Sequence, residues 1–216
     1  MKYKIAIFDL DGTLLNTLED LKNSLNYALN NFGYPVRTLD EVRRFVGNGI
    51  RKLIERSVPD SLTESEILNV YNKFTEHYSE HCADSTKPYD GIIDMLQLLR
   101  KKGIKTAVVS NKADYAVQSL CKNYFDGLFD AIAGEKVGIR KKPFPDSVKS
   151  ILTTLKIKNN DAVYIGDSDV DIQTAKNSET DCIIVDWGFR DRCFLIEAGA
   201  KTIVSTANQL QQLIIG

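Results

Sequence analysis

The sequence predicts an α/β protein with a doubly wound parallel-sheet, Rossmann-like core and an inserted all-α helical domain. Short apolar strands rich in valine and isoleucine alternate with helices over the second part of the chain, as in parallel sheets covered on both faces. A similar strand opens the chain at residues 4–8, but only helical patterns follow until about residue 82. The first strand therefore belongs with the later ones, and the helical stretch is an insertion.

The helices of the insert are predicted from their apolar spacing. After Thr13, apolar residues recur three and four positions apart, which places them on one face of a helix. Thr63 followed by Glu66 is a capping box, typical of a helix N-terminus. Pro35 and several glycines separate the helical pieces. The expected helices cover residues 18–32, 39–45, 50–57 and 63–81.

A turn cluster at residues 88–91 closes the helical stretch, and strands and helices alternate beyond it. We therefore expect a core domain of residues 1–15 and 83–216, and an inserted helical cap of residues 16–82. The expected core strands cover residues 4–8, 105–109, 130–133, 162–165, 182–185 and 202–204. The expected core helices cover residues 92–101, 113–124, 146–155, 169–177 and 208–214.

Composition and charge limit the possible partners. The 216 residues carry a net charge of −1 and no basic block, which argues against nucleic acid and anionic membrane surfaces. No apolar run approaches the ~20 residues that span a bilayer, and the chain enters a strand directly, so we expect neither a membrane anchor nor a signal peptide. The four cysteines form no C-x-x-C pair, which favours reduced thiols in a cytoplasmic protein.

Polar residues follow the first strand and two later ones. Carboxylates at the end of a buried strand are unfavourable unless a cation, a proton or hydrogen bonds compensate for them. In an open parallel sheet, ligands bind at the carboxyl ends of the strands. The polar segments are Asp9-Leu10-Asp11-Gly12-Thr13, Ser110-Asn111-Lys112, Gly166-Asp167-Ser168-Asp169-Val170-Asp171, and Lys142-Pro143 before a helix.

These residue types together favour phosphoryl transfer. Clustered aspartates offer the hard oxygen ligands that suit Mg²⁺, while a hydroxyl, a lysine and backbone N–H groups at helix starts suit phosphate. A carboxylate nucleophile beside them indicates an aspartyl phosphate. A calcium loop is excluded, since it needs Gly at position six and Glu at position twelve, where the two aspartate segments have Leu14 and Asp20, and Ile172 and Ser178.

The four segments, in this order, resemble the haloacid dehalogenase superfamily and, within it, the phosphoglycolate phosphatase-like group. The superfamily pattern is a strand before D-x-D-G-T, a strand before Ser or Thr, a Lys often before Pro, and a strand before G-D-x-x-x-D. The match covers essentially the whole chain, with the helical insert in the place of the family's cap. Asn16-Thr17 stands where many relatives have Asp-Ser, a change that affects the hinge into the cap more than the chemistry.

The resemblance implies a role for each residue. Asp9 would be the nucleophile and a Mg²⁺ ligand. Asp11 would be the general acid and then the general base, with its backbone carbonyl also on the metal. Asp167 would be the other direct protein ligand, and Asp171 would order metal-bound water or Lys142. The phosphoryl oxygens would be held by Ser110, by Lys142 and by backbone N–H groups near Gly12 and Asn111.

The expected function is that of a Mg²⁺-dependent phosphatase acting on a small phosphate ester. In the family, an acid in the place of Asp11 suits phosphatases and phosphomutases rather than dehalogenases, phosphonatases or transport ATPases. A phosphomutase of the β-phosphoglucomutase type and a pyrophosphatase stay open. A non-catalytic phospholigand-binding module is disfavoured, because no catalytic residue is lost. Phosphoglycolate, pyrophosphate, nucleotide monophosphates and sugar phosphates all fit a helical cap, and the protein is expected to be a monomer or a homodimer.

Two further segments bear on specificity. The run Phe45-Val46-Gly47-Asn48-Gly49-Ile50 resembles the phosphoglycolate phosphatase loop that folds over the active site, so we expect Gly47 and Asn48 to face substrate. The segment from Trp187 to Arg190 resembles another loop of the group, with its role left open. No role is assigned to the basic residues near the cap loop, which are Arg43, Arg44 and Arg51.

His77 and His81 share one face of a predicted helix, with Cys82 beside them. A zinc site would need two further ligands. We therefore expect these histidines to serve in packing or to lie at the surface.

Overall fold

The computed structural model describes residues 2–216, which form two compact units. One unit consists of residues 2–15 and Pro88–Gly216, and the other of Asn16–Lys87. Among the described residues, no helix is both long and apolar enough to cross a membrane. The expected division into a catalytic core and a cap stays a prediction, and each unit is described by itself.

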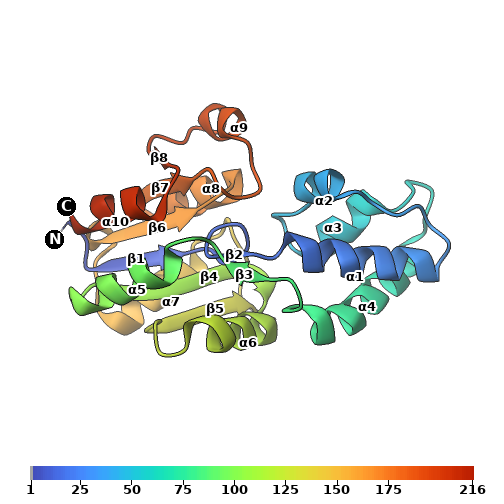
Figure 1. Ribbon diagram of the computed structural model, residues 1–216, viewed down its shortest axis with the longest axis horizontal. Helices are drawn as coiled ribbons and strands as arrows, with labels where there is room; N and C mark the ends of the chain where they lie inside the picture. Colours follow the sequence, from blue (N-terminus) through green and yellow to red (C-terminus); the bar gives the residue numbers. More distant parts are fainter. Residues whose placement is uncertain (1) are drawn as a thin grey trace. The chain divides into compact units, whose positions relative to one another are not determined.

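The larger unit contains a six-stranded sheet in the order β5-β4-β1-β6-β7-β8, and its paired strands run parallel (Figure 1). The first strand of the chain lies inside this sheet, between β4 and β6, which confirms the predicted doubly wound architecture. The strands are β1 (Ile5–Phe8), β4 (Lys105–Ala113), β5 (Ala131–Glu135), β6 (Ala162–Gly166), β7 (Asp181–Val185) and β8 (Ile203–Val204).

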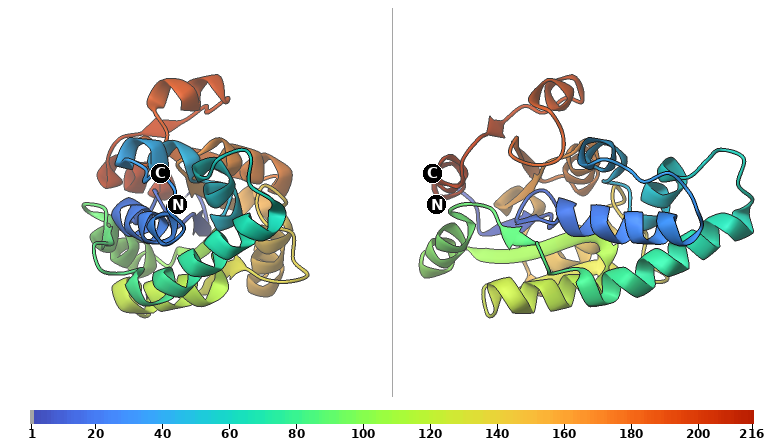
Figure 2. Two further views of the ribbon diagram at one scale, coloured as in Figure 1. Left: turned by 90° about the vertical axis from the view of Figure 1, so that its right-hand side faces the viewer. Right: turned by 45° about the vertical axis from the view of Figure 1, so that its right-hand side comes forward.

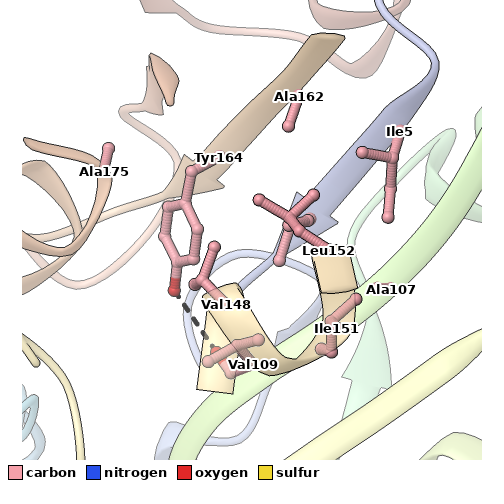
Figure 3. Packing of buried hydrophobic residues seen from close by; sticks show 10 residues of the cluster. Ile5, Ala107, Val109, Val148, Ile151, Leu152, Ala162, Tyr164 and Ala175 are labelled. Carbon is pink, nitrogen blue, oxygen red and sulfur yellow. Dashed lines mark hydrogen bonds between the residues drawn. The ribbon is translucent and has the colours of Figure 1, made fainter. Parts of the chain in front are cut away.

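Both faces of the sheet are buried. Helix α7 packs on one face, where Val148 and Leu152 meet Ile5 and Tyr164 of the strands (Figure 3). The alternate residue Phe8 is also fully buried, and helices α5 and α10 lie on the side opposite α7 (Figure 1). Each such large side chain contributes about 1.5–3 kcal/mol when it leaves water. The helices of this unit are α5 (Ile92–Lys101), α6 (Asp114–Phe125), α7 (Asp146–Leu155), α8 (Asp169–Ser178), α9 (Arg192–Glu197) and α10 (Ala207–Ile215).

Strand β4 is longer than the sequence predicts. The expected strand ended at Val109, where the apolar run stops, but β4 continues to Ala113 with a shift in its register against β5. The added residues Ser110, Asn111 and Lys112 are polar yet buried. Asn111 and Lys112 meet partners from distant segments, and the Ser110 hydroxyl accepts from the N–H of Lys112. Most other predicted elements agree to within one or two residues, whereas α9 and the two-residue strands β2 (Leu15–Asn16) and β3 (Lys87–Pro88) were not predicted.

The smaller unit is helical, as predicted, apart from the short strands β2 and β3, which pair with each other where the chain enters and leaves it. Helices α1 and α4 lie side by side (Figure 2), with Leu25, Leu29, Phe74 and Tyr78 buried. The predicted capping box of Thr63 is confirmed. The helices are α1 (Leu18–Asn31), α2 (Leu39–Phe45), α3 (Ile50–Ser57) and α4 (Glu64–His81).

A buried carboxylate on α1 fixes the segment that leaves the helical unit. Asp20 is 1% exposed, and its oxygens accept the backbone N–H groups of Ser85, at 2.9 and 3.1 Å, and of Thr86, at 2.8 Å. A charged acceptor on N–H groups at a buried site forms stronger hydrogen bonds than a neutral one. Asp20 therefore stabilises the segment that directly precedes β3.

We expect Asp20→Ala to lower the free energy of unfolding by about 2–3 kcal/mol, because it leaves two backbone N–H groups without their acceptor. Urea denaturation measures this loss. The control is Asp60→Ala, which removes an exposed carboxylate of the same unit and should change the stability by less than about 0.5 kcal/mol. Equal stabilities of the two variants would contradict the role of Asp20.

Candidate active site

The candidate site lies at the carboxyl ends of three neighbouring strands. Asp9 follows β1, Ser110 lies near the end of β4, and Asp167 follows β6. Because β4 and β6 flank β1 in the sheet, residues that lie about 100 and 160 positions apart in sequence meet at one edge. The topology thus brings together the aspartates and the polar residues that the sequence singled out.

A buried lysine joins two of the carboxylates. The side chain of Lys142 is 4% exposed, and its Nζ lies 2.9 Å from Asp9 Oδ2 and 2.8 Å from Asp171 Oδ1. Burial alone would lower the pKa of Lys142, but the charges of Asp171 and Asp9 outweigh it and hold the pKa well above its ordinary value. Lys142 is therefore a fixed positive charge beside Asp9.

Asp171 is fully buried, and both of its oxygens accept hydrogen bonds from the protein. Oδ1 accepts from Lys142 and, at 3.2 Å, from the Tyr164 hydroxyl, which also lies 3.3 Å from the Val109 carbonyl oxygen (Figure 3). Oδ2 accepts from the Ser168 hydroxyl and backbone N–H in the capping box that starts α8. These bonds hold Asp171 beside Lys142, and its role in ordering Lys142 or metal-bound water stays a prediction.

The segment that follows β7 helps to hold Asp167. The backbone N–H of Phe189 donates to Asp167 Oδ2 at 2.7 Å, and the Thr13 hydroxyl donates to Oδ1 at 3.3 Å. The backbone at residue 188 lies so close to Asp167 that only glycine fits, since a Cβ on Gly188 would lie 2.4 Å from Asp167. Trp187 Nε1 donates to the Thr13 carbonyl at 3.1 Å, so this segment, whose role the sequence left open, forms part of the site.

Asp9, Asp167 and Asp171 form a carboxylate cluster, in which one oxygen from each lies within 4.8 Å of the others. Burial raises the pKa of Asp9 to about 7, against the opposing charge of Lys142, and raises the pKa of Asp167 to about 8, with the charge of Asp171 adding to the rise. Hard oxygen donors with an excess of negative charge fit a divalent cation such as Mg²⁺. The predicted assignment of Asp9 and Asp167 as the direct ligands stays a prediction.

The side chain of Asp11 is paired with a lysine to which the sequence analysis gave no role. Lys112 Nζ lies 2.8 and 3.0 Å from the two carboxylate oxygens of Asp11. Side chains alternate between the two faces of a strand, so a longer β4 would have placed Lys112 on the same face as Ser110. This placement was missed because the strand was expected to end at Val109. The expected metal contact of Asp11 was through its backbone carbonyl, and that stays a prediction.

Ser110 and Asn111 are both buried, but their side chains bind other parts of the site. The Asn111 amide accepts from the backbone N–H of Lys142 at 2.8 Å and donates to its carbonyl at 3.1 Å. The hydroxyl of Ser110 accepts from the backbone N–H of Lys112 at 3.2 Å. Asn111 thus fixes the main chain of Lys142, while the predicted phosphate contacts of Ser110, Asn111 and Gly12 stay predictions.

The predicted substrate residues Gly47 and Asn48 belong to the smaller unit, between α2 and α3. Asn48 Oδ1 accepts from Arg56 at 2.8 Å, and Arg51 pairs with Glu55 and Glu64. The substrate role of this loop stays a prediction.

The histidines of α4 are packed into an aromatic stack. His77 lies between Tyr27 and His81, with ring centroids 4.1 and 4.2 Å apart. These ring contacts agree with the expected packing role.

Comparison with known proteins identifies the family. The model of the haloacid dehalogenase-like hydrolases matches residues 6–185. A phosphoglycolate phosphatase from Aquifex aeolicus is 35% identical over 191 residues, which cover 86% of each chain, and one from Mesorhizobium japonicum is 36% identical over 203 residues, covering 89% of this chain and 86% of the relative. The chain therefore belongs to the haloacid dehalogenase-like hydrolase family.

A solved structure from Lactobacillus delbrueckii subsp. bulgaricus, provisionally assigned as a phosphoglycolate phosphatase, is 42% identical to this chain. The two share a TM-score of 0.95 over 99% of each chain. The likeness extends over both units, so the particular group within the family that this chain resembles is that of the phosphoglycolate phosphatases.

The raised pKa values predict how stability depends on pH without divalent cations. The folded protein binds protons at Asp9 and Asp167 more tightly than the unfolded chain, so their contribution to stability is present at low pH and is lost as pH rises from about 4 to about 8. The amide of Asn cannot ionise, so Asp167→Asn should escape part of this loss. In the presence of chelator, we expect the melting temperature of Asp167→Asn, relative to that of the wild type, to rise by about 5 °C between pH 5 and pH 8.

The control for this effect is Asp169→Asn, which alters a half-exposed carboxylate two residues further along, at the start of α8. Its melting temperature should follow the wild type across this pH range. A difference between Asp167→Asn and wild type that stays constant with pH would contradict the raised pKa of Asp167.

Proposed function

We propose that this haloacid dehalogenase-like hydrolase is a Mg²⁺-dependent phosphatase that hydrolyses a small phosphate monoester, of the phosphoglycolate type, through an aspartyl phosphate. The observation that carries the proposal is the setting of Asp9, a carboxylate at the end of β1 with one oxygen 2.9 Å from the Lys142 ammonium and with Asp167 in the same cluster. A nucleophile, a fixed positive charge and a cation site meet there. The resemblance to phosphoglycolate phosphatases supports the choice of substrate class.

In the first step, Asp9 forms a bond to phosphorus as the bond from phosphorus to the ester oxygen breaks. Asp11 gives its proton to the departing oxygen, which leaves as an alcohol. In the second step, a water molecule attacks phosphorus and gives a proton to Asp11, so phosphate leaves and the Asp9 carboxylate is restored. The two roles of Asp11 therefore return the enzyme to its starting protonation state.

The other residues of the site bind the phosphoryl group and balance its charge. Lys142 lies beside Asp9 and would neutralise the oxygens of the phosphoryl group during transfer. The hydroxyl of Ser110 and the backbone near Gly12 would donate to the same oxygens. Asp9 and Asp167, with the Asp11 backbone carbonyl, would hold Mg²⁺, which supplies further positive charge at the phosphoryl group when bound. Residues 16–82 would serve as the cap, with Gly47 and Asn48 toward substrate.

We expect Asp9→Asn to reduce phosphate release by at least about 10³-fold, because the amide is not a nucleophile. Chelation of divalent cations should abolish activity, and added Mg²⁺ should restore it. With wild-type protein, hydride reduction during turnover should trap the acyl phosphate at residue 9, detected by peptide mass spectrometry. Asp169→Asn serves as the control and should stay active. Turnover that survives both Asp9→Asn and chelator would rule out the proposal.

Product analysis separates the phosphatase from the alternatives that use the same residues. Phosphoglycolate, pyrophosphate, a nucleotide monophosphate and a sugar phosphate are offered in parallel. We expect the substrate with the highest kcat/KM to be a phosphate monoester and the product to be free phosphate. An isomerised sugar phosphate without free phosphate would instead identify a phosphomutase, and a preference for pyrophosphate would identify a pyrophosphatase.

A further inference from the structure

We propose that Lys112 is a positioning residue for the acid–base carboxyl of Asp11. The inference rests on the proposed function, because that function gives Asp11 its role in proton transfer. Lys112 Nζ lies 2.8 Å from Asp11 Oδ1 and 3.0 Å from Oδ2. The side chain of Lys112 is 3% exposed and that of Asp11 is 22% exposed, so the lysine lies beneath the carboxyl while part of the carboxyl faces outward.

Contact with both oxygens restrains the carboxyl of Asp11. The side chain has two rotatable bonds, and an ammonium within hydrogen-bond distance of each oxygen limits both of them. A buried ammonium also needs an anion close by, since leaving it alone would be strongly unfavourable. Because proton transfer requires the acid within about 2.6–3.2 Å of the oxygen that it serves, a small rotation of this carboxyl would slow the reaction.

The main chain of Lys112 is itself held firmly. It lies inside β4, within the shift in register that ends at the pairing of Ala113 with Glu135, and its N–H donates to the hydroxyl of Ser110 at 3.2 Å. Its carbonyl oxygen lies against Gly134, where a Cβ would come within 2.8 Å of it. These contacts fix the backbone from which the lysine reaches Asp11, as a residue that positions another requires.

The two buried lysines of the site have different partners. Lys142 binds Asp9 and Asp171, whereas Lys112 binds Asp11. The nucleophile and the acid are thus each held by their own cation. When Asp11 carries its proton, one oxygen can donate to the leaving group while the other still accepts from Lys112, so the restraint applies in both steps of the reaction.

The leaving group gives the sharpest test. p-Nitrophenolate departs readily without a proton, whereas the alkoxide of phosphoglycolate needs one. We expect Lys112→Met to lower kcat/KM for phosphoglycolate by ~30–100-fold, but for p-nitrophenyl phosphate by less than ~3-fold. Lys112→Arg, which keeps the cation, should recover part of the loss. The control is Lys105→Met on the same strand, an exposed lysine paired with Asp130, and it should change neither value.

A double-mutant cycle shows whether Lys112 acts through Asp11. In the Asp11→Asn background, Lys112→Met should cause no further loss with phosphoglycolate, and because this double variant removes both charges of the pair it is the variant best able to fold. The inference would be overturned if the double variant lost the product of the two single fold-losses in kcat/KM, or if Lys112→Met lost equally with both esters. Neither result would contradict the proposed phosphatase activity. Failure of wild-type protein to release phosphate from either ester would instead reject the proposed function.

Discussion

The structure of the site depends on the ammonium of Lys142, which lies between the carboxylates of Asp9 and Asp171. Asp167 brings a third carboxylate into the same cluster. One positive charge cannot balance three negative ones. Burial raises the pKa values of Asp9 and Asp167, and the charge of Asp171 adds to the rise. Under the proposed function, a divalent cation supplies the missing positive charge. Under that proposal, the excess of negative charge at the site is the source of its affinity for metal.

The groups around Lys142 are held by neighbours from separate parts of the chain. Asn111 of β4 holds its main chain, and the capping box of α8 orients Asp171. Asp167 is held by Thr13 from the first turn and by the backbone of Phe189 beyond β7. These segments meet only because β1 lies between β4 and β6. The sheet order therefore determines which residues can take part in the chemistry.

Much of this arrangement follows from the sequence. Periodicity located the helices and most strands, and the ordered aspartate, serine and lysine segments identified the edge of the sheet where they meet. Local patterns could not reveal the extension of β4, since the buried Lys112 pairs with Asp11, which lies 101 positions away in the sequence. The hydrogen bond from the N–H of Phe189 to Asp167 could not be predicted either, because every residue except proline carries such a donor. What escaped prediction depends on contacts between distant segments.

The carboxylate cluster, which is partly protonated in the absence of metal, should lose protons when a cation binds. Calorimetric titration of Mg²⁺ at pH 7, in buffers of different ionisation enthalpy, measures the protons released. We expect a release of roughly one proton per Mg²⁺, and we expect both this release and the affinity to fall in Asp167→Asn. Binding of Mg²⁺ without proton release, or with unchanged affinity in Asp167→Asn, would contradict this expectation.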